Sequence, residues 1–262
     1  MSEWSYRFTH AVVREIAESA TGGLRAVDTG APDLARFRQD HTDYVAALRE
    51  TGAEITVLPA LESFPDSCFV EDAALCLPGC AVIMRPGAPS RLGEAAAIQP
   101  CLEGLYSTVL TISNGFIEGG DILVTGREIL VGRSARTDSD GVAELTRLTE
   151  ALGHDVREVE TPPGVLHFKT DCSLMDDETI LATPRLDASG CFEDYRVIHT
   201  AEGEEACANA IRFNDLVLFP AGFPRTRDRL TDAGYAVREI GNSEAAKLDG
   251  GMSCLSLRFS PS

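Results

Sequence analysis

A thiol and an imidazole stand at similar places in two segments of the sequence. Cys254 follows a glycine pair in "LDGGMSCLSLRF", and His167 lies between an apolar run and a hairpin-like segment in "VLHFKTDCSL". A cysteine and a histidine that converge can act as a nucleophile and a proton shuttle, and glycines let the backbone approach a ligand closely. A lone histidine in such a segment is more often structural, so the pairing with Cys254 is what favours a catalytic site.

Carboxylates also occur in segments that are otherwise apolar. "FPDSCFVEDAAL" contains Asp66, Glu71 and Asp72, and "FIEGGDILV" contains Glu118 and Asp121. Burial of an unpartnered carboxylate is costly, so each such acid reaches solvent, caps a turn or binds a cation. Any one of them alone favours a turn or cap. Their recurrence at equivalent places indicates a shared centre that accepts a cationic group.

The elements that would position these residues follow a recurring pattern of strand, turn, strand, helix and strand. Gly or Asp turns join the apolar strands, and helical periodicity follows them. The pattern covers 73–84 with a helix at 92–105 and a strand at 107–112, then 121–132 with 142–152 and 155–160, then the hairpin 172–182 with a short helical part, then 208–220 with 225–234 and 235–240. The sequence therefore predicts an α/β fold of repeated ββαβ units.

The two ends of the sequence supply a fifth unit. A strand at 9–16 precedes a helix at 33–52 and a strand at 54–59, and the strand 254–259 lacks a partner of its own. Pairing of the first and last strands would close a ring and remove the exposed sheet edges. Five units of about fifty residues account for the length. We therefore expect a single domain, 1–262, built as a closed ring.

Composition limits the partners. The formal net charge of −18 disfavours nucleic acid and anionic membranes as ligands, and no apolar run is long enough for a membrane span. The first residues lack the basic and apolar regions of a secretion signal, so we expect a cytoplasmic protein. The oligomeric state stays open, and a homodimer is compatible with the sequence.

Eight cysteines are scattered along the chain, and without a secretion signal they are expected to be free thiols. Cys76 and Cys80 form the only close pair, and no second Cys/His pair stands at ligand spacing. A hairpin with two small apolar residues is the better interpretation of "CLPGC". We expect neither a metal nor an organic cofactor.

Five motifs in register resemble one known family. The segments "PDSCFVEDAALC", "RPGAPSRLGE", "IEGGDILVTGREILVGRSARTDSDG", "LHFKT" and "LDGGMSCLSLRF" are similar to the dimethylarginine dimethylaminohydrolases of the guanidino-group-modifying, or pentein, superfamily. The resemblance covers essentially the whole chain. It implies a five-bladed α/β propeller of pseudo-symmetric ββαβ units around a central active-site pocket, in agreement with the repeats.

The same resemblance implies roles for individual residues. Cys254 would be the nucleophile, His167 the general acid and base, and Glu118 the carboxylate that orients the site. The remaining positions match those that bind the substrate, a small molecule: Asp72 with Glu118 for the guanidinium, Asp66 and Glu71 for the acidic wall, Arg91 and Arg136 for the α-carboxylate, and Leu24 and Leu248 for the amino-acid end.

The implied reaction hydrolyses dimethylarginine, or monomethylarginine, to citrulline and the methylated amine through a thiouronium on Cys254. Carboxylates suit a cationic amidine, and arginine suits an α-carboxylate. Because negative neighbours disfavour a thiolate, we expect the Cys254 thiol to be neutral until the cationic substrate arrives.

Other functions stay open. An arginine deiminase would release ammonia, but its relatives typically carry an acid two residues after the catalytic histidine, where this chain has Lys169. A non-catalytic binding protein for cationic amino acids has no need of Cys254 and His167. A thiol redox protein would need a second cysteine beside Cys254. Cys68 and Cys172 are interpreted as small apolar residues rather than nucleophiles.

Overall fold

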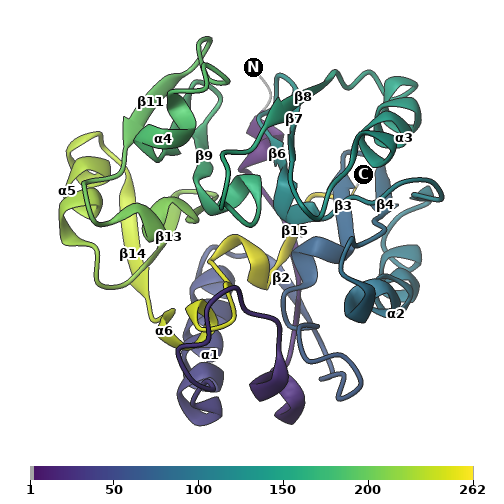
Figure 1. Cartoon of the computed structure of the whole chain (residues 1–262), viewed down its shortest axis with the longest axis horizontal. Coiled ribbons are helices and arrows are strands. Elements are labelled where there is room, and N and C mark those ends of the chain that lie inside the picture. The colour runs from purple at the N-terminus through teal and green to yellow at the C-terminus, as the bar shows by residue number, and fades with distance from the viewer. Residues whose placement is uncertain (1–2, 262) are drawn as a thin grey trace.

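Five three-stranded sheets are arranged in a ring, with their helices on the outside (Figure 1). This computed structural model describes residues 3–261. In each sheet the inner strand pairs antiparallel with the middle strand, and the middle strand pairs in parallel with the outer one. A helix connects the middle and outer strands. The predicted ββαβ unit and five-bladed α/β propeller are confirmed.

Four of the units are continuous in sequence. The first contains β3 (Ala74–Leu77), β4 (Cys80–Ile83), α2 (Leu92–Glu103) and β5 (Val109–Thr111), and the second contains β6 (Ile122–Val124), β7 (Ile129–Arg133), α3 (Ser139–Glu150) and β8 (Val156–Glu160). The third contains β9 (Cys172–Asp176), β10 (Thr179–Ala182), α4 (Pro184–Asp187) and β11 (Arg196–His199), and the fourth contains β12 (Ile211–Phe213), β13 (Leu216–Pro220), α5 (Pro224–Asp232) and β14 (Ala236–Ile240).

The fifth unit joins the two ends of the sequence, as predicted. It consists of β15 (Leu257–Phe259), β1 (His10–Arg14), α1 (Leu34–Glu50) and β2 (Glu54–Leu58). β15 pairs antiparallel with β1, in a register that places Leu257 opposite Val12. This pairing closes the ring, so that the inner strands of all five sheets surround one axis.

Apolar runs explain why the inner and middle strands are buried. Every residue of β4 and β10 is buried, whereas the outer strands β5, β8 and β11 are partly exposed. The outer helices cover the sheets with one apolar face. α1, for example, is capped by Asp33, which precedes its first residue and whose side chain accepts hydrogen bonds from the backbone N–H groups of Ala35 and Arg36.

The structure corrects the predicted bounds in three places. β11 was not expected from the sequence. It is only four residues long and has a polar residue, Arg196 or His199, at each end, so it lacks the apolar run that indicates a strand. α3 begins at Ser139 rather than 142, because Asp138 caps it by accepting from the N–H of Gly141 at 2.8 Å. The last strand begins at Leu257, so Cys254 lies in the turn that precedes it rather than in the strand itself.

All eight cysteines carry free thiols. Cys80 pairs with Leu77 at the β3–β4 hairpin, on the other side of the Pro-Gly turn from Cys76, which confirms the hairpin interpretation of this pair. Between residues 3 and 261, no helix combines the length and the apolar character that crossing a membrane requires.

Candidate active site

A short 3-10 turn precedes the inner strand of every unit. These turns are η3 (Val70–Ala73), η5 (Gly119–Asp121), η6 (Phe168–Thr170), η7 (Glu205–Ala208) and η8 (Ser253–Leu255). η3 contacts both η8 and η5, η5 contacts η6, and η6 contacts η7. The turns therefore gather at one end of the ring axis. The candidate catalytic residues lie in these turns or directly beside them, so candidate residues of different units come together there.

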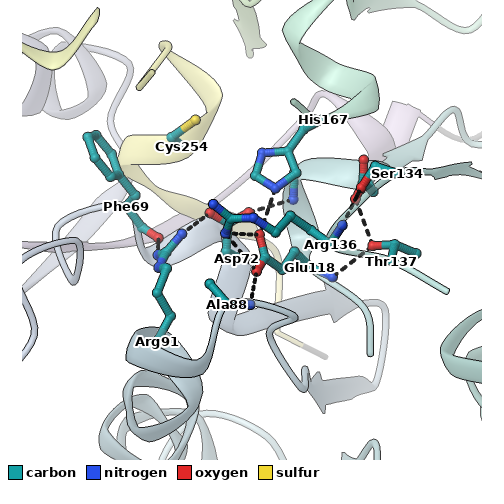
Figure 2. A network of polar contacts seen from close by, with 12 residues as sticks. Phe69, Asp72, Ala88, Arg91, Glu118, Ser134, Arg136, Thr137, His167 and Cys254 are labelled. Atoms are coloured by element: carbon teal, nitrogen blue, oxygen red, sulfur yellow. Dashed lines mark hydrogen bonds and ion pairs between the residues drawn. The ribbon is translucent and has the colours of Figure 1, made fainter. Parts of the chain in front are cut away.

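A pocket at this end collects most of the predicted site residues. It is lined by Leu24, Asp66, Asp72, Arg91, Arg136, His167, Leu248 and Cys254, together with Phe69, Leu166, Asp249 and Gly250. Glu118 is fully buried and lies beside His167 and Arg136 (Figure 2). Glu71 does not line this pocket.

His167 and Glu118 form a close buried pair. Nε2 of His167 lies 2.6 Å from Oε2 of Glu118. Burial lowers the pKa of His167, but the negative charges of Asp72, Glu118 and Asp121 outweigh it and raise that pKa to about 9. For Glu118 the two effects have the opposite sign. Burial alone would raise the pKa of Glu118, but the hydrogen bond to His167 has the larger effect, so the pKa of Glu118 is lowered. At neutral pH the pair is therefore an imidazolium and a carboxylate.

Asp72 is held from two sides. Its Oδ1 accepts from the N–H of Gly120 at 2.8 Å, and its Oδ2 accepts from Nη1 of Arg91 at 2.5 Å. A Cβ atom on Gly120 would come within 2.7 Å of His167 Nδ1 and 2.8 Å of Asp72 Oδ1. Only glycine lets this backbone approach both groups, which explains one glycine of "EGGD".

Arg91 lies in the pocket wall with its guanidinium already engaged by protein groups. Besides Asp72, its Nε and Nη2 donate to Oε2 of Glu94, at 3.0 and 2.7 Å, and Nη2 donates to the carbonyl of Phe69 at 2.9 Å. The side chain is buried. In this arrangement Arg91 orients Asp72. The sequence predicted only that Arg91 would contact the α-carboxylate of the substrate, so this second role was not foreseen.

Arg136 reaches the same carboxylate as His167. Its Nη1 lies 3.2 Å from Oε1 and 3.3 Å from Oε2 of Glu118, and Oε1 also accepts from the N–H of Ala88 at 3.2 Å. Figure 2 shows its guanidinium in front of Glu118 and Asp72, on the side that faces Cys254. Glu118 and Asp72 therefore lie where they can bind a guanidinium group.

The Cys254 thiol faces this group across the pocket (Figure 2). Its Sγ accepts from the N–H of Gly251 at 3.4 Å and lies 3.9 Å from Nδ2 of Asn209. Burial, with the charges of Glu71 and Asp72, raises the pKa of Cys254 to about 12. This direction agrees with the expectation of a neutral thiol.

A loop that carries Leu24 is tied to the pocket rim. The N–H of Leu24 donates to Oδ1 of Asp66 at 2.9 Å, and the N–H of Ala26 donates to Oδ2 of Asp249 at 2.5 Å. Burial raises the pKa of Asp66, although Arg91 opposes the shift. Asp66 therefore holds the Leu24 loop in place, with Leu248 nearby on the same pocket.

The structure places Glu71 differently from the other acids. Its carboxylate accepts from Ser253 Oγ at 2.6 Å and from Nη2 of Arg258 at 2.7 Å, and it lies 2.5 Å from Nζ of Lys169. Ser253 directly precedes Cys254 and Lys169 is two residues from His167, but neither these two residues nor Arg258 lines the pocket, so the contacts of Glu71 lie outside it. Glu71 is thus outside the acidic wall of this pocket, because the adjacent residues Glu71 and Asp72 of η3 point to opposite sides.

Sequence reasoning missed one supporting residue, Asn209, and named a second, Asp121, without giving it a role of its own. Asn209 follows η7 and accepts from the N–H of Ser253 through Oδ1 at 2.8 Å. Asp121 accepts from Ser134 Oγ and Thr137 Oγ1, both at 2.7 Å, and from the N–H of Phe168 at 2.8 Å. The signal for Asn209 was its position in "CANAIRF", the junction of the fourth unit that corresponds to those of Asp72, Glu118, His167 and Cys254.

One group of side chains has the spacing of metal ligands. Ligand atoms of Asp72, Glu118 and His167 lie within 4.8 Å of one another. Arg91 and Arg136 donate to these two carboxylates, and the raised pKa of His167 favours its protonated form, which does not bind metal. The group is therefore better suited to an organic cation that donates hydrogen bonds.

Comparison with known proteins identifies relatives of the chain. The family model described as "N,N dimethylarginine dimethylhydrolase, eukaryotic" matches residues 32–167. The N(G),N(G)-dimethylarginine dimethylaminohydrolase of Pseudomonas aeruginosa is 39% identical over 96% of this chain and 100% of that protein. A Streptomyces coelicolor protein of the same name is 34% identical over 82% of this chain and 83% of that one.

Solved structures agree with these relatives. The P. aeruginosa enzyme, as a cysteine-to-serine mutant complexed with citrulline, superposes with a TM-score of 0.93 at 38% identity and covers 97% of this chain and 100% of that one. The N-terminal domain of ArgZ, an arginine dihydrolase of cyanobacteria, has a TM-score of 0.81 at 18% identity over 96% of this chain and 98% of that one, which is a likeness of fold. The chain belongs to the dimethylarginine dimethylaminohydrolase family.

Proposed function

We propose that this protein hydrolyses Nω,Nω-dimethyl-L-arginine to L-citrulline and dimethylamine, and Nω-monomethyl-L-arginine to L-citrulline and methylamine. One observation carries the proposal: a buried thiol at Cys254 faces a His167–Glu118 pair and Asp72 across a single pocket. A thiol nucleophile, a protonated imidazole and carboxylates for a cation are the groups that this substitution at a guanidinium carbon requires.

The substrate binds through charge complementarity. Its guanidinium donates to Asp72 and Glu118, in place of the contact that Arg136 makes with Glu118. Arg136 and Arg91 then face the α-carboxylate, since both line the pocket. Leu24 and Leu248, with Asp66 behind the Leu24 loop, enclose the amino-acid end. Glu71 supports the floor under Cys254.

The reaction proceeds in two halves. The Cys254 thiol loses its proton to solvent as the cation arrives, and the sulfur attacks the central guanidinium carbon. His167 gives its proton to the leaving dimethylamine as the C–N bond breaks, which leaves a thiouronium on the sulfur. His167, now neutral, accepts a proton from water as the water oxygen bonds to that carbon. The C–S bond then breaks as the remaining hydroxyl proton passes to the sulfur, which releases citrulline and restores the Cys254 thiol.

Burial and charge give His167 and Cys254 the protonation states that these steps require. The raised pKa of His167 keeps its ring protonated for the first half, and the raised pKa of Cys254 keeps the thiol neutral until a cation offsets Asp72 and Glu71. The nucleophile is therefore generated in the presence of the group that it attacks. Each step balances with the substrate, one water molecule, the side chains of this chain and the solvent that takes up the thiol proton.

The remaining features follow from the same proposal. Residues 1–262 act as a single catalytic domain, because each of the five units contributes a turn to the site. The partner is a small molecule, and one copy of the chain supplies every residue named, so the reaction does not depend on a homodimer. Eight free thiols suit the reducing cytoplasm, where we place the reaction.

A product assay tests the proposal. Asymmetric dimethylarginine, monomethylarginine and arginine are incubated separately with purified protein, and citrulline and the released amine are quantified. Cys254→Ser is the inactive variant, and Cys101→Ser, on α2 and outside the pocket, is its matched control. We expect citrulline from the methylated substrates, no product with Cys254→Ser and full activity with Cys101→Ser.

Other outcomes would contradict the proposal. Citrulline and ammonia formed mainly from arginine would identify a deiminase. No citrulline from any of the three substrates would exclude both activities, and full activity in Cys254→Ser would exclude the nucleophile. The preference between methylated and unmethylated substrate is the sharpest part of the assay, because a single methyl group changes binding by only about 1–3 kcal/mol.

A further inference from the structure

A second cavity lies at the other end of the ring axis. The catalytic pocket is formed at the turns, whereas the second cavity is lined by residues of the inner strands that follow them, β3, β6, β9, β12 and β15. Counting its open mouth, it has a volume of about 920 Å³.

The floor of this cavity is the back of the catalytic pocket. Glu71, Lys169, Ser253 and Arg258 line it, and Glu71 joins the other three through the contacts described above. Lys169 is two residues from His167, and Ser253 precedes Cys254. One layer of ion pairs therefore separates the two cavities. It includes a residue close in sequence to His167 and a residue next to Cys254.

The lining of the second cavity is positively charged in an acidic protein. Among the described residues that line it, Glu71 is the one acid, and Lys169, Arg212 and Arg258 are cations. The formal net charge of the whole chain is −18, so this excess of cations is local to the cavity. Lys169 is buried and the two arginines are partly buried, and cations removed from water are costly unless an anion accompanies them.

Two donors on the floor have hydrogen-bonding capacity to spare. Nζ of Lys169 carries three N–H groups, and Glu71 is its one ion-pair partner among residues 3–261. Ser173, four residues further along on β9, has a buried Oγ with no hydrogen-bond partner in the described chain. Both residues are more than nine-tenths buried, and both line the cavity. An ammonium and a hydroxyl match the two oxygens of one carboxylate.

The walls above these donors are apolar. Leu75, Leu77, Ile122, Leu174, Ile211 and Phe259 line the cavity between the floor and its mouth. Such walls favour a hydrocarbon or aryl group and disfavour a strongly hydrated phosphate or a polyanion. The donors and the walls together define a ligand with one carboxylate and an apolar body.

We propose that this second cavity binds an amphiphilic monocarboxylic acid, with its carboxylate at Lys169 and Ser173 and its apolar body against the inner strands. The site is independent of the proposed hydrolase reaction, because none of the residues that hold this carboxylate lines the catalytic pocket. Bound acid draws Lys169 away from Glu71 and so changes the support beneath Cys254.

The single tryptophan of the chain provides the measurement. Trp4 is among the residues that line the cavity, so its fluorescence reports occupancy of this site directly. The full-length protein is titrated with octanoate and with octanamide, its neutral counterpart, and binding is followed by Trp4 fluorescence and by calorimetry. We expect saturable binding of octanoate and at least tenfold weaker binding of octanamide, because the amide lacks the charge that Lys169 and Ser173 recognise.

Two serine variants locate the carboxylate. Ser173→Ala is expected to weaken octanoate binding by about tenfold, since a hydrogen bond to a charged group is lost. Ser67→Ala is the matched control, because Ser67 Oγ is also buried and without a partner in the described chain but lies outside this cavity. Lys169→Met is expected to weaken binding further while Arg258 continues to pair with Glu71.

The proposal is overturned if octanoate fails to bind at millimolar concentration, or if octanamide binds equally well. It is also overturned if Ser173→Ala and Ser67→Ala behave alike. Displacement of bound octanoate by L-citrulline, without a fluorescence change from Trp4, would place the acid in the catalytic pocket instead. These results do not depend on whether the protein hydrolyses methylated arginine.

Discussion

Nε2 of His167 and Oε2 of Glu118 lie 2.6 Å apart in a buried position where Arg136 also contacts Glu118. One carboxylate therefore stabilises two cations, the imidazolium and a guanidinium. This arrangement explains how a histidine that is buried can still be protonated at neutral pH. Loss of the Glu118 carboxylate would therefore leave both the His167 imidazolium and the Arg136 guanidinium without this partner.

Replacement of Glu118 by Gln is expected to lower the pKa of His167. Burial lowers this pKa, and the variant lacks the negative charge of Glu118 that raises it. Activity toward methylated arginine should fall by roughly 100-fold or more, the usual effect of losing a general acid. NMR titration of the imidazole signals measures the first effect, and the citrulline assay measures the second. Glu150→Gln, at the exposed end of α3, is the control. An unchanged His167 titration in Glu118→Gln would contradict this view of the pair.

His167 should make folding stability depend on pH. Its pKa in the folded protein, about 9, lies above the value of about 6.5 in an unfolded chain. Its stabilising contribution is therefore complete below about pH 6.5 and is lost as pH rises through about 9. Chemical unfolding between pH 6 and 10 should show a stability difference between the wild type and His167→Gln that shrinks with rising pH. Parallel curves for the two proteins would be the opposite result.

The Cys254 thiol is expected to react slowly with iodoacetamide at neutral pH. Because its pKa is raised to about 12, the rate should rise about tenfold per pH unit up to pH 10 without levelling off. Mass spectrometry of the peptide that contains Cys254 separates its alkylation from that of the other thiols. A plateau with an apparent pKa well below about 7 would show that the free thiol is already ionised.

Gly120→Ala is expected to abolish activity with little change in folding. The added Cβ would lie 2.7 Å from His167 Nδ1 and 2.8 Å from Asp72 Oδ1, so both groups must move. Gly22→Ala is the matched control, since no atom lies within 4 Å of the corresponding Cβ. The citrulline assay and circular dichroism are compared for both variants. Retained activity in Gly120→Ala would mean that the positions of His167 and Asp72 are not critical.

Asn209→Ala should weaken the turn that carries Cys254. Loss of the amide leaves the N–H of Ser253 without its acceptor, which costs about 1–3 kcal/mol of stability for a buried group. The maximal rate should fall more than substrate affinity, because Asn209 contacts the thiol and does not line the pocket. Asn209→Asp keeps an oxygen for Ser253 and is expected to recover stability but not the rate. Equal activity of Asn209→Ala and the wild type would exclude this positioning role.

The sequence predicted the ring and most of the pocket because both depend on local patterns. Apolar runs separated by turn residues identify the ββαβ unit, and the unpaired strand at 254–259 indicates the closure with β1. The polar residues at the unit junctions could be assigned to a shared centre because repeats place equivalent positions together. These inferences needed no knowledge of side-chain direction.

The direction of side chains within the turns could not be predicted. Glu71 and Asp72 are adjacent in one 3-10 turn, yet Asp72 enters the catalytic pocket and Glu71 joins Lys169 and Arg258 on the floor of the second cavity. Which residue takes which side depends on partners that are distant in sequence. The same limit hid the contact of Arg91 with Glu94 and the position of Asn209 beside the thiol.

The pairing of β15 with β1 has a consequence for how function is lost. Asp72, Glu118, His167, Asn209 and Cys254 come from five different units, and no unit holds two of them. Opening the ring at any interface between units separates groups that must act together, even if each sheet stays intact. Catalytic activity is thus a sensitive reporter of partial unfolding, and in denaturant it should vanish no later than the first sheet melts.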